Sequence, residues 1–269
     1  MVSIIVPTFN RGELLRQAVD SALRQTFTDF EVVVVNDGGD PVEEFADPRV
    51  HVVRRPSSGG AAAARNAGLD YARGRYVTFL DDDDEFTPDR LALGLRGLED
   101  APVSLCWKAQ LGSGQLEWAR RLDGEVPDAM LSAAVPQLGS ALVDARLALR
   151  MDESFRVSED VEWWLRMSEV GAVRTIPEVG YLIREHAGPR LRDRVQMRLE
   201  HRLRLLEMHQ AFFATHRNAA AYHWRRAAGL AATTGDTRLA ARCFRSSFRA
   251  RPSARTVGSA ARTLLRGPG

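Results

Sequence analysis

Four consecutive aspartates, Asp81 to Asp84, are the residues of this chain most suited to chemistry. They follow the apolar run 75–80, which is typical of a buried strand. Carboxylates crowded at the end of a strand repel one another, and a divalent cation that prefers oxygen ligands is the simplest compensation. Asp81 and Asp83 would share one side if strand geometry continues, and they could then bind Mg²⁺ or Mn²⁺. The alternative is a solvated acidic turn before a helix.

Other polar residues follow neighbouring apolar segments. Asp37 is followed by two glycines, and it could accept a hydrogen bond from a nucleobase N–H or simply close a turn. Asn10 could contact a ligand or cap the next helix. Arg65 lies on an alanine-rich helix entered through Gly59 and Gly60, where it could pair with a diphosphate or remain a surface arginine.

Alternating strands and helices must position these residues. The apolar patterns predict strands at 2–6, 31–35, 51–53 and 75–80, the first of them stopped by Pro7. They predict helices at 14–24, at 61–72, and from a cap at Thr87 with Pro88 as first residue to about 98. This order indicates an α/β fold with a doubly wound, mostly parallel sheet, whose ligands lie beyond the carboxyl ends of the strands.

The second half of the chain is less regular. We expect strands at 103–107 and 140–143, a helix at 159–169 capped by Ser158, and a strand at 175–184 broken by Pro177 and Gly180. From about residue 190 the pattern is helical. The expected organisation is therefore a domain at 1–190 followed by a basic α-helical extension at 191–269.

Composition bounds the class of protein. The 269 residues are 45% hydrophobic and 27% charged, which is typical of a globular protein with one large core. Cys106 and Cys243 are far apart in sequence and predict neither a disulfide framework nor a cysteine zinc site. We find no run of roughly 20 apolar residues and no signal-peptide pattern, and we expect a cytoplasmic protein.

Charge is distributed unevenly. Residues 1–189 carry 20 basic and 31 acidic side chains, and residues 190–269 carry 17 and 4, within a net charge of +2. The acidic part could concentrate cations, and the basic part suits an anionic membrane surface or an acidic partner. Nucleic acid is not an expected partner, because no aromatic platform is interleaved with the arginines.

Five segments, in this order, resemble the family 2 glycosyltransferases of the GT-A fold: 2–11, 21–27, 34–39, 64–68 and 77–84. The resemblance covers roughly 1–190 and implies a nucleotide-binding half at about 1–100 and an acceptor half at about 101–190. It departs from the usual signature of two acids before Gly-Ser, because Asn36 and Gly39 occupy the outer places. The Gln-x-x-Arg-Trp pattern of processive synthases is missing, so we expect transfer of a single sugar.

The resemblance implies a role for individual positions. Thr8 and Asp37 would contact the nucleobase, Arg65 the nucleotide, Asp81 the ribose or the metal, and Asp83 the metal. The whole expected nucleotide site comprises Pro7, Thr8, Asn10, Asp37, Arg65 and Asp81.

Two later motifs complete the expected site. Ser158-Glu159-Asp160 resembles the family's Glu-Asp motif, which makes Asp160 the expected general base, although acids are also favoured in any first helical turn. The segment 184–186 resembles the family's Arg-x-His strand, which makes His186 an expected metal ligand, although a lone histidine is often structural.

The expected function is metal-dependent, inverting transfer of a sugar from a nucleotide-diphosphate sugar, with UDP as the expected nucleotide, to an acceptor hydroxyl of a glycan, lipid-linked sugar, protein or small molecule. Mn²⁺ or Mg²⁺ is the expected cofactor. The alternatives are a sugar-phosphate nucleotidyltransferase, which would release pyrophosphate, and a non-catalytic nucleotide-sugar binding protein. Neither dinucleotide-binding nor P-loop glycine motifs occur.

Overall fold

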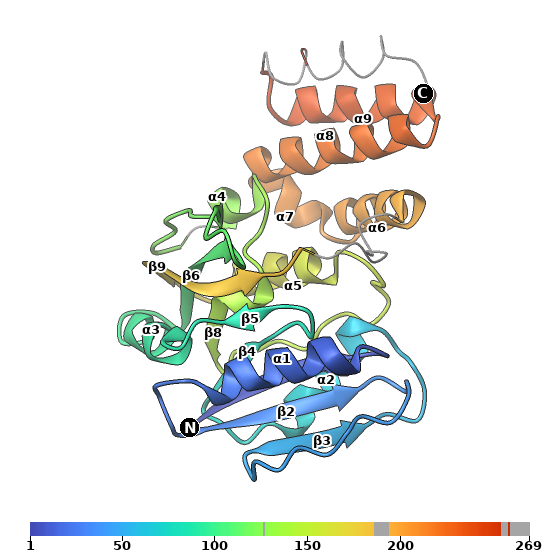
Figure 1. Ribbon diagram of the computed structural model, residues 1–269. Coiled ribbons are helices and arrows are strands. Elements are labelled where there is room, and N and C mark those ends of the chain that lie inside the picture. Colours follow the sequence, from blue (N-terminus) through green and yellow to red (C-terminus); the bar gives the residue numbers. More distant parts are fainter. Residues whose placement is uncertain (126, 186–193, 254–257, 259–269) are drawn as a thin grey trace. The chain divides into compact units, whose positions relative to one another are not determined.

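The computed structural model describes residues 1–125, 127–185, 194–253 and 258, and these form two compact units (Figure 1). One unit comprises Met1–Val126 and Pro136–Ala187, and the other comprises Pro127–Val135 and Gly188–Gly269. The sequence pattern placed 127–135 in the first domain, whereas these residues belong to the helical unit.

The first unit contains a mixed sheet with the strand order β3-β2-β1-β4-β8-β6-β9-β5, and β7 pairs with β6. Strands β1, β2, β3 and β4 are mutually parallel, as are β6 and β9, whereas β8, β5 and β7 pair antiparallel with their neighbours. The strands are β1 Val2–Thr8, β2 Phe30–Asn36, β3 Val50–Arg54, β4 Tyr76–Phe79, β5 Glu85–Phe86, β6 Val103–Gln110, β7 Leu116–Trp118, β8 Ala141–Asp144 and β9 Val173–Ile183.

Helices cover both faces of the parallel part of the sheet. The apolar side of α1 (Gly12–Leu23) packs in one cluster with alternate β1 residues such as Val2 and Ile4. On the other face, a Cβ at Gly68 of α2 (Ala61–Tyr71) would lie 2.3 Å from Ile5 Cγ2, so glycine permits the close approach of this helix. The remaining helices of the unit are α3 Arg90–Gly97, the 3₁₀ turn η1 Leu138–Ser140 and α5 Glu159–Met167. The expected α/β fold is confirmed.

Pro7 does not end the first strand, as the sequence suggested. Thr8 O still accepts a hydrogen bond from Asp37 N at 2.9 Å, so β1 continues along β2. Residues 3, 5 and 7 of β1 turn their backbone polar groups towards β4, where Leu80 N donates to Ile5 O at 2.9 Å. Because β4 ends at Phe79, opposite Ile5, no β4 carbonyl requires the missing N–H of Pro7.

Three further boundary expectations were wrong in detail. Helix α3 begins at Arg90, because the Thr87 hydroxyl donates to Val179 O at 3.3 Å and extends the pairing with β9 instead of capping. Ser158 precedes α5 in a left-handed conformation, φ 60°, and makes no side-chain cap hydrogen bond. Strand β9 is not broken at Pro177 and Gly180; it continues with register shifts opposite β6.

The second unit is helical, as expected from about residue 190 onwards for the residues described. Its helices are α4 Pro127–Leu131, α6 Val195–Met208, α7 Gln210–Thr215, α8 Arg217–Thr233 and α9 Thr237–Ala250. Helices α8 and α9 lie side by side (Figure 1), and the Asp236 side chain caps α9 by accepting from Leu239 N at 2.8 Å. Among the described residues, no helix has the length and apolar character needed to cross a membrane.

Candidate active site

The four aspartates form a turn immediately after β4. Asp84 N donates to Asp81 O at 3.1 Å, so strand geometry does not continue through this segment as the sequence suggested. The carboxylates nevertheless divide into two pairs. Asp82 and Asp84 are each 7% exposed, whereas Asp81 and Asp83 are half-buried and remain accessible.

The buried pair anchors the turn to the strands on either side. Thr8 Oγ1 donates to Asp82 Oδ2 at 2.7 Å, and Tyr181 Oη donates to Asp84 Oδ2 at 2.6 Å. Burial raises the pKa of Asp82 to about 6 and that of Asp84 to about 7, and the neighbouring aspartates add to the rise. The hydrogen bonds that Asp82 and Asp84 accept hold the acidic turn between β1 and β9.

The first of the accessible carboxylates, Asp81, is bound by two donors. Arg65 Nη2 lies 2.7 Å from its Oδ1, and Gln137 Nε2 donates to its Oδ2 at 2.8 Å. Arg65 also donates from Nη1 to Glu159 Oε1 at 2.9 Å, at the first residue of α5. Arg65 therefore joins the end of β4 to the helix that carries Asp160.

Burial is the main influence on this bridge. Arg65 is only 5% exposed, and its Nε has no hydrogen-bond partner among the described residues. Burial raises the pKa of Glu159, and the positive charge of Arg65 opposes that rise. The expected surface or diphosphate-facing arginine is thus a buried ion-pair residue, and its contact with a nucleotide stays a prediction.

The second accessible carboxylate, Asp83, is paired with Arg11. Arg11 Nη1 lies 2.5 Å from Asp83 Oδ2 and 3.1 Å from Asp82 Oδ1. Arg11 immediately precedes α1, and its side chain is 35% exposed. Sequence reasoning did not select Arg11, although its place after Asn10, within the segment that resembles the family, was a usable signal.

Asp37 lies where the sequence predicted, beside the end of β1, but its carboxylate is already occupied. Ser58 Oγ and Gly60 N donate to Oδ2, each at 2.7 Å, Gly59 N donates to Oδ1 at 3.1 Å, and Arg55 pairs with Oδ1. A carboxylate has about four acceptor positions, so these contacts fill it. Asp37 fixes the loop that leads into α2, and a base could bind it only by replacing one of the donors.

The residues that depart from the family signature close a turn. Asn36 Nδ2 donates to Asp40 O at 2.7 Å and Asn36 Oδ1 accepts from Gly39 N at 3.0 Å. Asn10, at φ 55°, accepts from Asp40 N at 2.7 Å. A Cβ at Gly39 would lie 2.2 Å from Asn10 Oδ1, so this contact requires glycine. The Asn10 side chain therefore holds the loop that contains Asp40, and it does not cap α1.

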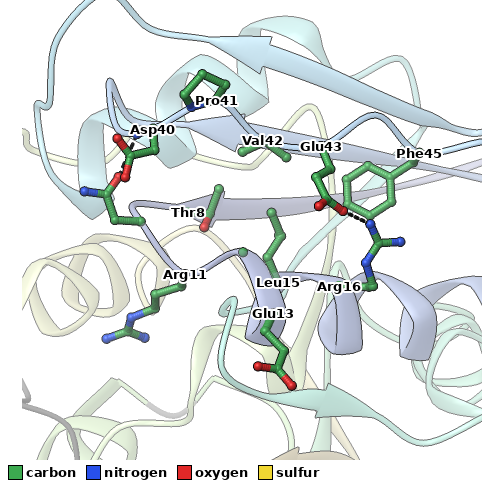
Figure 2. A pocket seen from close by; sticks show the side chains of 12 residues that line it. Thr8, Arg11, Glu13, Leu15, Arg16, Asp40, Pro41, Val42, Glu43 and Phe45 are labelled. Atoms are coloured by element: carbon green, nitrogen blue, oxygen red, sulfur yellow. Dashed lines mark hydrogen bonds and ion pairs between the residues drawn. The ribbon is translucent and has the colours of Figure 1, made fainter.

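A cavity opens beside these loops, with a volume of about 440 Å³. Thr8, Asn10 and Arg11 are among its lining residues, and Arg11 lies at the opposite end from Arg16 and its ion-pair partner Glu43 (Figure 2). This volume is within the range of small-molecule sites in proteins. Two of the lining residues, Thr8 and Arg11, contact Asp82 of the acidic turn, and the third, Asn10, binds the neighbouring loop at Asp40.

Asp160 lies in the first turn of α5 and is half-buried. Its charge, together with those of Asp84, Glu117 and Asp81, acts on Lys108 of β6, whose pKa burial lowers and these carboxylates raise. Lys108 is the only lysine of the chain, and sequence reasoning overlooked it. Asp81 and Asp160 thus both lie close enough to Lys108 for their charges to act on it.

The donor set suits a hard cation in its chemistry. Asp81 and Asp83 offer oxygen ligands, and Mg²⁺ is commonly held by one or two carboxylates together with substrate phosphates. Within residues 1–125, 127–185, 194–253 and 258, no group of three or more His, Cys, Asp or Glu side chains is arranged to hold a metal. His186, the third expected ligand, lies outside the described residues.

Solved structures with the same architecture identify the fold. S. aureus TarS residues 1–349 in complex with UDP-GlcNAc matches with a TM-score of 0.64 and 16% identity, over 98% of this chain and 90% of that one. The mannosyltransferase PcManGT of Pyrobaculum calidifontis, in complex with GDP-Man and Mn²⁺, matches with a TM-score of 0.58 and 17% identity, over 98% and 79%. The fold is that of the GT-A glycosyltransferases.

The family follows from the sequence comparison. The profile of glycosyl transferase family 2 matches residues 3–137, and the chain belongs to this family. The Escherichia coli UDP-Glc:alpha-D-GlcNAc-diphosphoundecaprenol beta-1,3-glucosyltransferase WfgD is 36% identical over 98 residues, which are 35% of this chain and 39% of that protein. Other curated relatives are matched over 15 to 37% of their own length.

Proposed function

We propose that this protein is an inverting, metal-dependent glycosyltransferase that moves one sugar from a nucleotide-diphosphate sugar to an acceptor hydroxyl. The observation that carries the proposal is the Arg65 bridge. It ties Asp81, on the expected donor side, to Glu159 at 2.7 and 2.9 Å, one residue before the expected base Asp160. In a family 2 chain, this link between the two acidic motifs supports a transfer site in which donor and acceptor halves lie next to each other.

The reaction is a single displacement at the anomeric carbon. The acceptor oxygen forms a bond to that carbon while the bond to the diphosphate oxygen breaks, and the nucleotide leaves with the electron pair. Asp160 takes the proton of the attacking hydroxyl, as a general base. One displacement inverts the anomeric configuration.

Asp81 and Asp83 would hold the Mn²⁺ or Mg²⁺ ion, which stabilises negative charge on the leaving diphosphate when it is bound. The protein supplies the positions. Arg65 and Gln137 orient Asp81, Arg11 pairs with Asp83 in the ligand-free site, and the Glu159 ion pair fixes the first turn of α5. Alignment of the reacting groups provides much of the rate in such transfers.

We propose UDP as the donor nucleotide, because WfgD is named for UDP-Glc and TarS has been solved with UDP-GlcNAc. The GDP-Man complex of PcManGT makes GDP the main competitor. Calorimetric titration with UDP, dTDP, GDP and CDP, with and without Mn²⁺, separates them. We expect UDP to bind best, Mn²⁺ to strengthen binding, Asp83→Ala to abolish the metal effect and Asp160→Asn to preserve it.

Two outcomes would refute the proposal. If no nucleotide binds, the region has no donor function. If UDP binds but metal makes no difference in the wild type, the carboxylates of the turn do not act through a cation. Release of pyrophosphate from a nucleoside triphosphate and a sugar phosphate would instead identify a nucleotidyltransferase.

We further propose that the enzyme works in the cytoplasm and contacts an anionic membrane surface. Cys106 and Cys243 are buried and free, which suits a reducing compartment. Helix α9 carries exposed arginines at a spacing that places them on one face, and no acid follows Asp236 in the chain: Arg238, Arg242, Arg245 and Arg249.

Vesicle sedimentation tests the membrane contact. We expect the full chain to pellet with vesicles rich in phosphatidylglycerol at low salt, to be released at high salt, and to ignore phosphatidylcholine. Changing the four α9 arginines to glutamine should abolish pelleting. A control with the same charge change in the first unit should still pellet: Arg24, Arg96, Arg121 and Arg150, each to glutamine. Equal losses in the two variants would show only a net-charge effect.

A further inference from the structure

Arg11 is attached to the acidic turn at the point where a cation would bind. Its Nη1 contacts Asp83 Oδ2 at 2.5 Å and Asp82 Oδ1 at 3.1 Å. Asp82 is itself fixed, because Thr8 Oγ1 donates to its other oxygen at 2.7 Å. One nitrogen of Arg11 therefore bridges the buried, hydrogen-bonded carboxylate of Asp82 and the more accessible carboxylate of Asp83.

A divalent cation and Arg11 would compete for the same oxygen. Mg²⁺ and related ions approach a carboxylate oxygen to about 2.1 Å, so an ion on Asp83 Oδ2 would lie within a few ångströms of the guanidinium. Two positive charges at that separation repel strongly in a partly buried site. The contact with Arg11 therefore lowers the affinity of Asp83 for a cation.

Arg11 also has space to move, and a bound donor would give it an alternative anionic partner. Its side chain is 35% exposed and lines the cavity of about 440 Å³ with Thr8 and Asn10, two residues of the expected nucleotide site (Figure 2). A diphosphate is a strong partner for a guanidinium, because its oxygens match the fork of N–H donors. A donor in this region would offer Arg11 a replacement for Asp83.

We propose that Arg11 occupies the place of the cation at Asp83 in the nucleotide-free enzyme and turns to the donor diphosphate when the cation binds. This inference rests on the proposed function and adds a consequence to it. Metal and nucleotide then bind cooperatively, because each removes an obstacle to the other. Arg11 is a positioning residue that selects the complete metal–nucleotide pair over the free ion.

Direct Mn²⁺ binding to the nucleotide-free protein tests the proposal without any activity measurement. The loss of Mn²⁺ signal in electron paramagnetic resonance gives the dissociation constant for the wild type and for Arg11→Gln. We expect the variant to bind Mn²⁺ alone about tenfold more tightly, since couplings between sites commonly amount to about 5- to 150-fold. With saturating UDP, the wild type should gain affinity for Mn²⁺ and the variant should gain less.

Two variants control for charge and for folding. Arg16→Gln removes the same charge from α1, the helix that Arg11 immediately precedes. Arg16 pairs with Glu43 at the far end of the cavity, so Mn²⁺ affinity in the free protein should match the wild type (Figure 2). Arg11→Lys keeps a cation beside Asp83 and should remain close to the wild type. Arg11→Met replaces the glutamine variant if circular dichroism shows that the latter is unfolded.

The outcomes separate this proposal from the proposed function. If Arg11→Gln binds Mn²⁺ no more tightly than the wild type, or if Arg16→Gln gains as much, Arg11 is not a competitor and the inference is wrong. If the wild type binds no UDP, the donor function fails, while the comparison of Mn²⁺ affinities without nucleotide still decides the role of Arg11. Failure of every variant to bind Mn²⁺ overturns both.

Discussion

Removing the positive charge of Arg65 should destabilise the first unit, and a second substitution should restore part of the loss. Arg65→Met breaks the contact to Asp81 at 2.7 Å and the contact to Glu159 at 2.9 Å. Both carboxylates then face each other across an apolar side chain. The double variant Arg65→Met with Glu159→Gln removes one of the two negative charges.

The structure indicates which carboxylate is destabilised more by the loss of Arg65. Asp81 keeps the Gln137 amide at 2.8 Å and its side chain is 22% exposed, whereas the Glu159 side chain is 11% exposed. Loss of one partner from a buried ion pair destabilises a protein by about 3–5 kcal/mol. An amide at position 159 leaves an unmade hydrogen bond instead of an unpaired charge, which amounts to about 1–3 kcal/mol. The second substitution should therefore recover about 2 kcal/mol.

Urea unfolding followed by tryptophan fluorescence measures these differences, because the first unit contains four of the five tryptophans: Trp107, Trp118, Trp163 and Trp164. The titration belongs at alkaline pH, because burial raises the pKa of Glu159 and a higher pH favours its ionised form. If Arg65→Met is as stable as the wild type, or if the double variant is less stable than Arg65→Met, the buried bridge is not what holds these elements. UDP titration of the folded double variant then reports any direct contact of Arg65 with the nucleotide.

Three other outcomes follow from the same structure. Asp160→Asn should lower sugar transfer by about 10²–10⁴-fold with little change in UDP affinity, measured by product formation and calorimetry. Burial and, after it, Arg202 lower the pKa of His223 well below its ordinary value, so the unfolded chain binds an extra proton at this residue as the pH falls below about 6.5; in urea unfolding followed by circular dichroism, His223→Gln should gain stability relative to the wild type between about pH 7.5 and about pH 5.5. A Cβ at Gly139 would lie 1.9 Å from Tyr181 Cε2, so Gly139→Ala should destabilise the protein by about 1–3 kcal/mol, and an unchanged melting temperature would contradict that packing.

Local patterns predicted the framework of the fold well. The continuous valines of β2 reflect burial of that strand on both faces, and the helical spacing of apolar residues in α1 reflects burial on one face. The local sequence pattern therefore reveals both elements. The predictions that were wrong concern residues whose conformation depends on a partner distant in the sequence. Pro7 is tolerated because β4 ends early, and Thr87 follows β9 instead of capping α3.

The site shows the same division. The sequence paired Asp81 with Asp83 as possible cation ligands on one side of a continuing strand. The structure leaves those two accessible, although a turn and not a strand separates them. No pattern could show that Arg65 pairs with Glu159, 94 positions away. Partners so distant in sequence are set by topology, which places the start of α5 beside the end of β4.

These long-range pairs also explain why the site should accept metal and donor together. Asp81 pairs with Arg65 and Asp83 with Arg11, so each accessible carboxylate already has a positively charged partner before any ligand arrives. A lone divalent cation would add positive charge beside two arginines, and a lone diphosphate would add negative charge beside two aspartates. The complex of cation and nucleotide diphosphate carries little net charge. Its cation can pair with Asp83 while its diphosphate pairs with Arg11, so neither member of that ion pair is left without a counter-charge. Charge balance in the ligand-free site therefore favours binding of the complex over binding of either component.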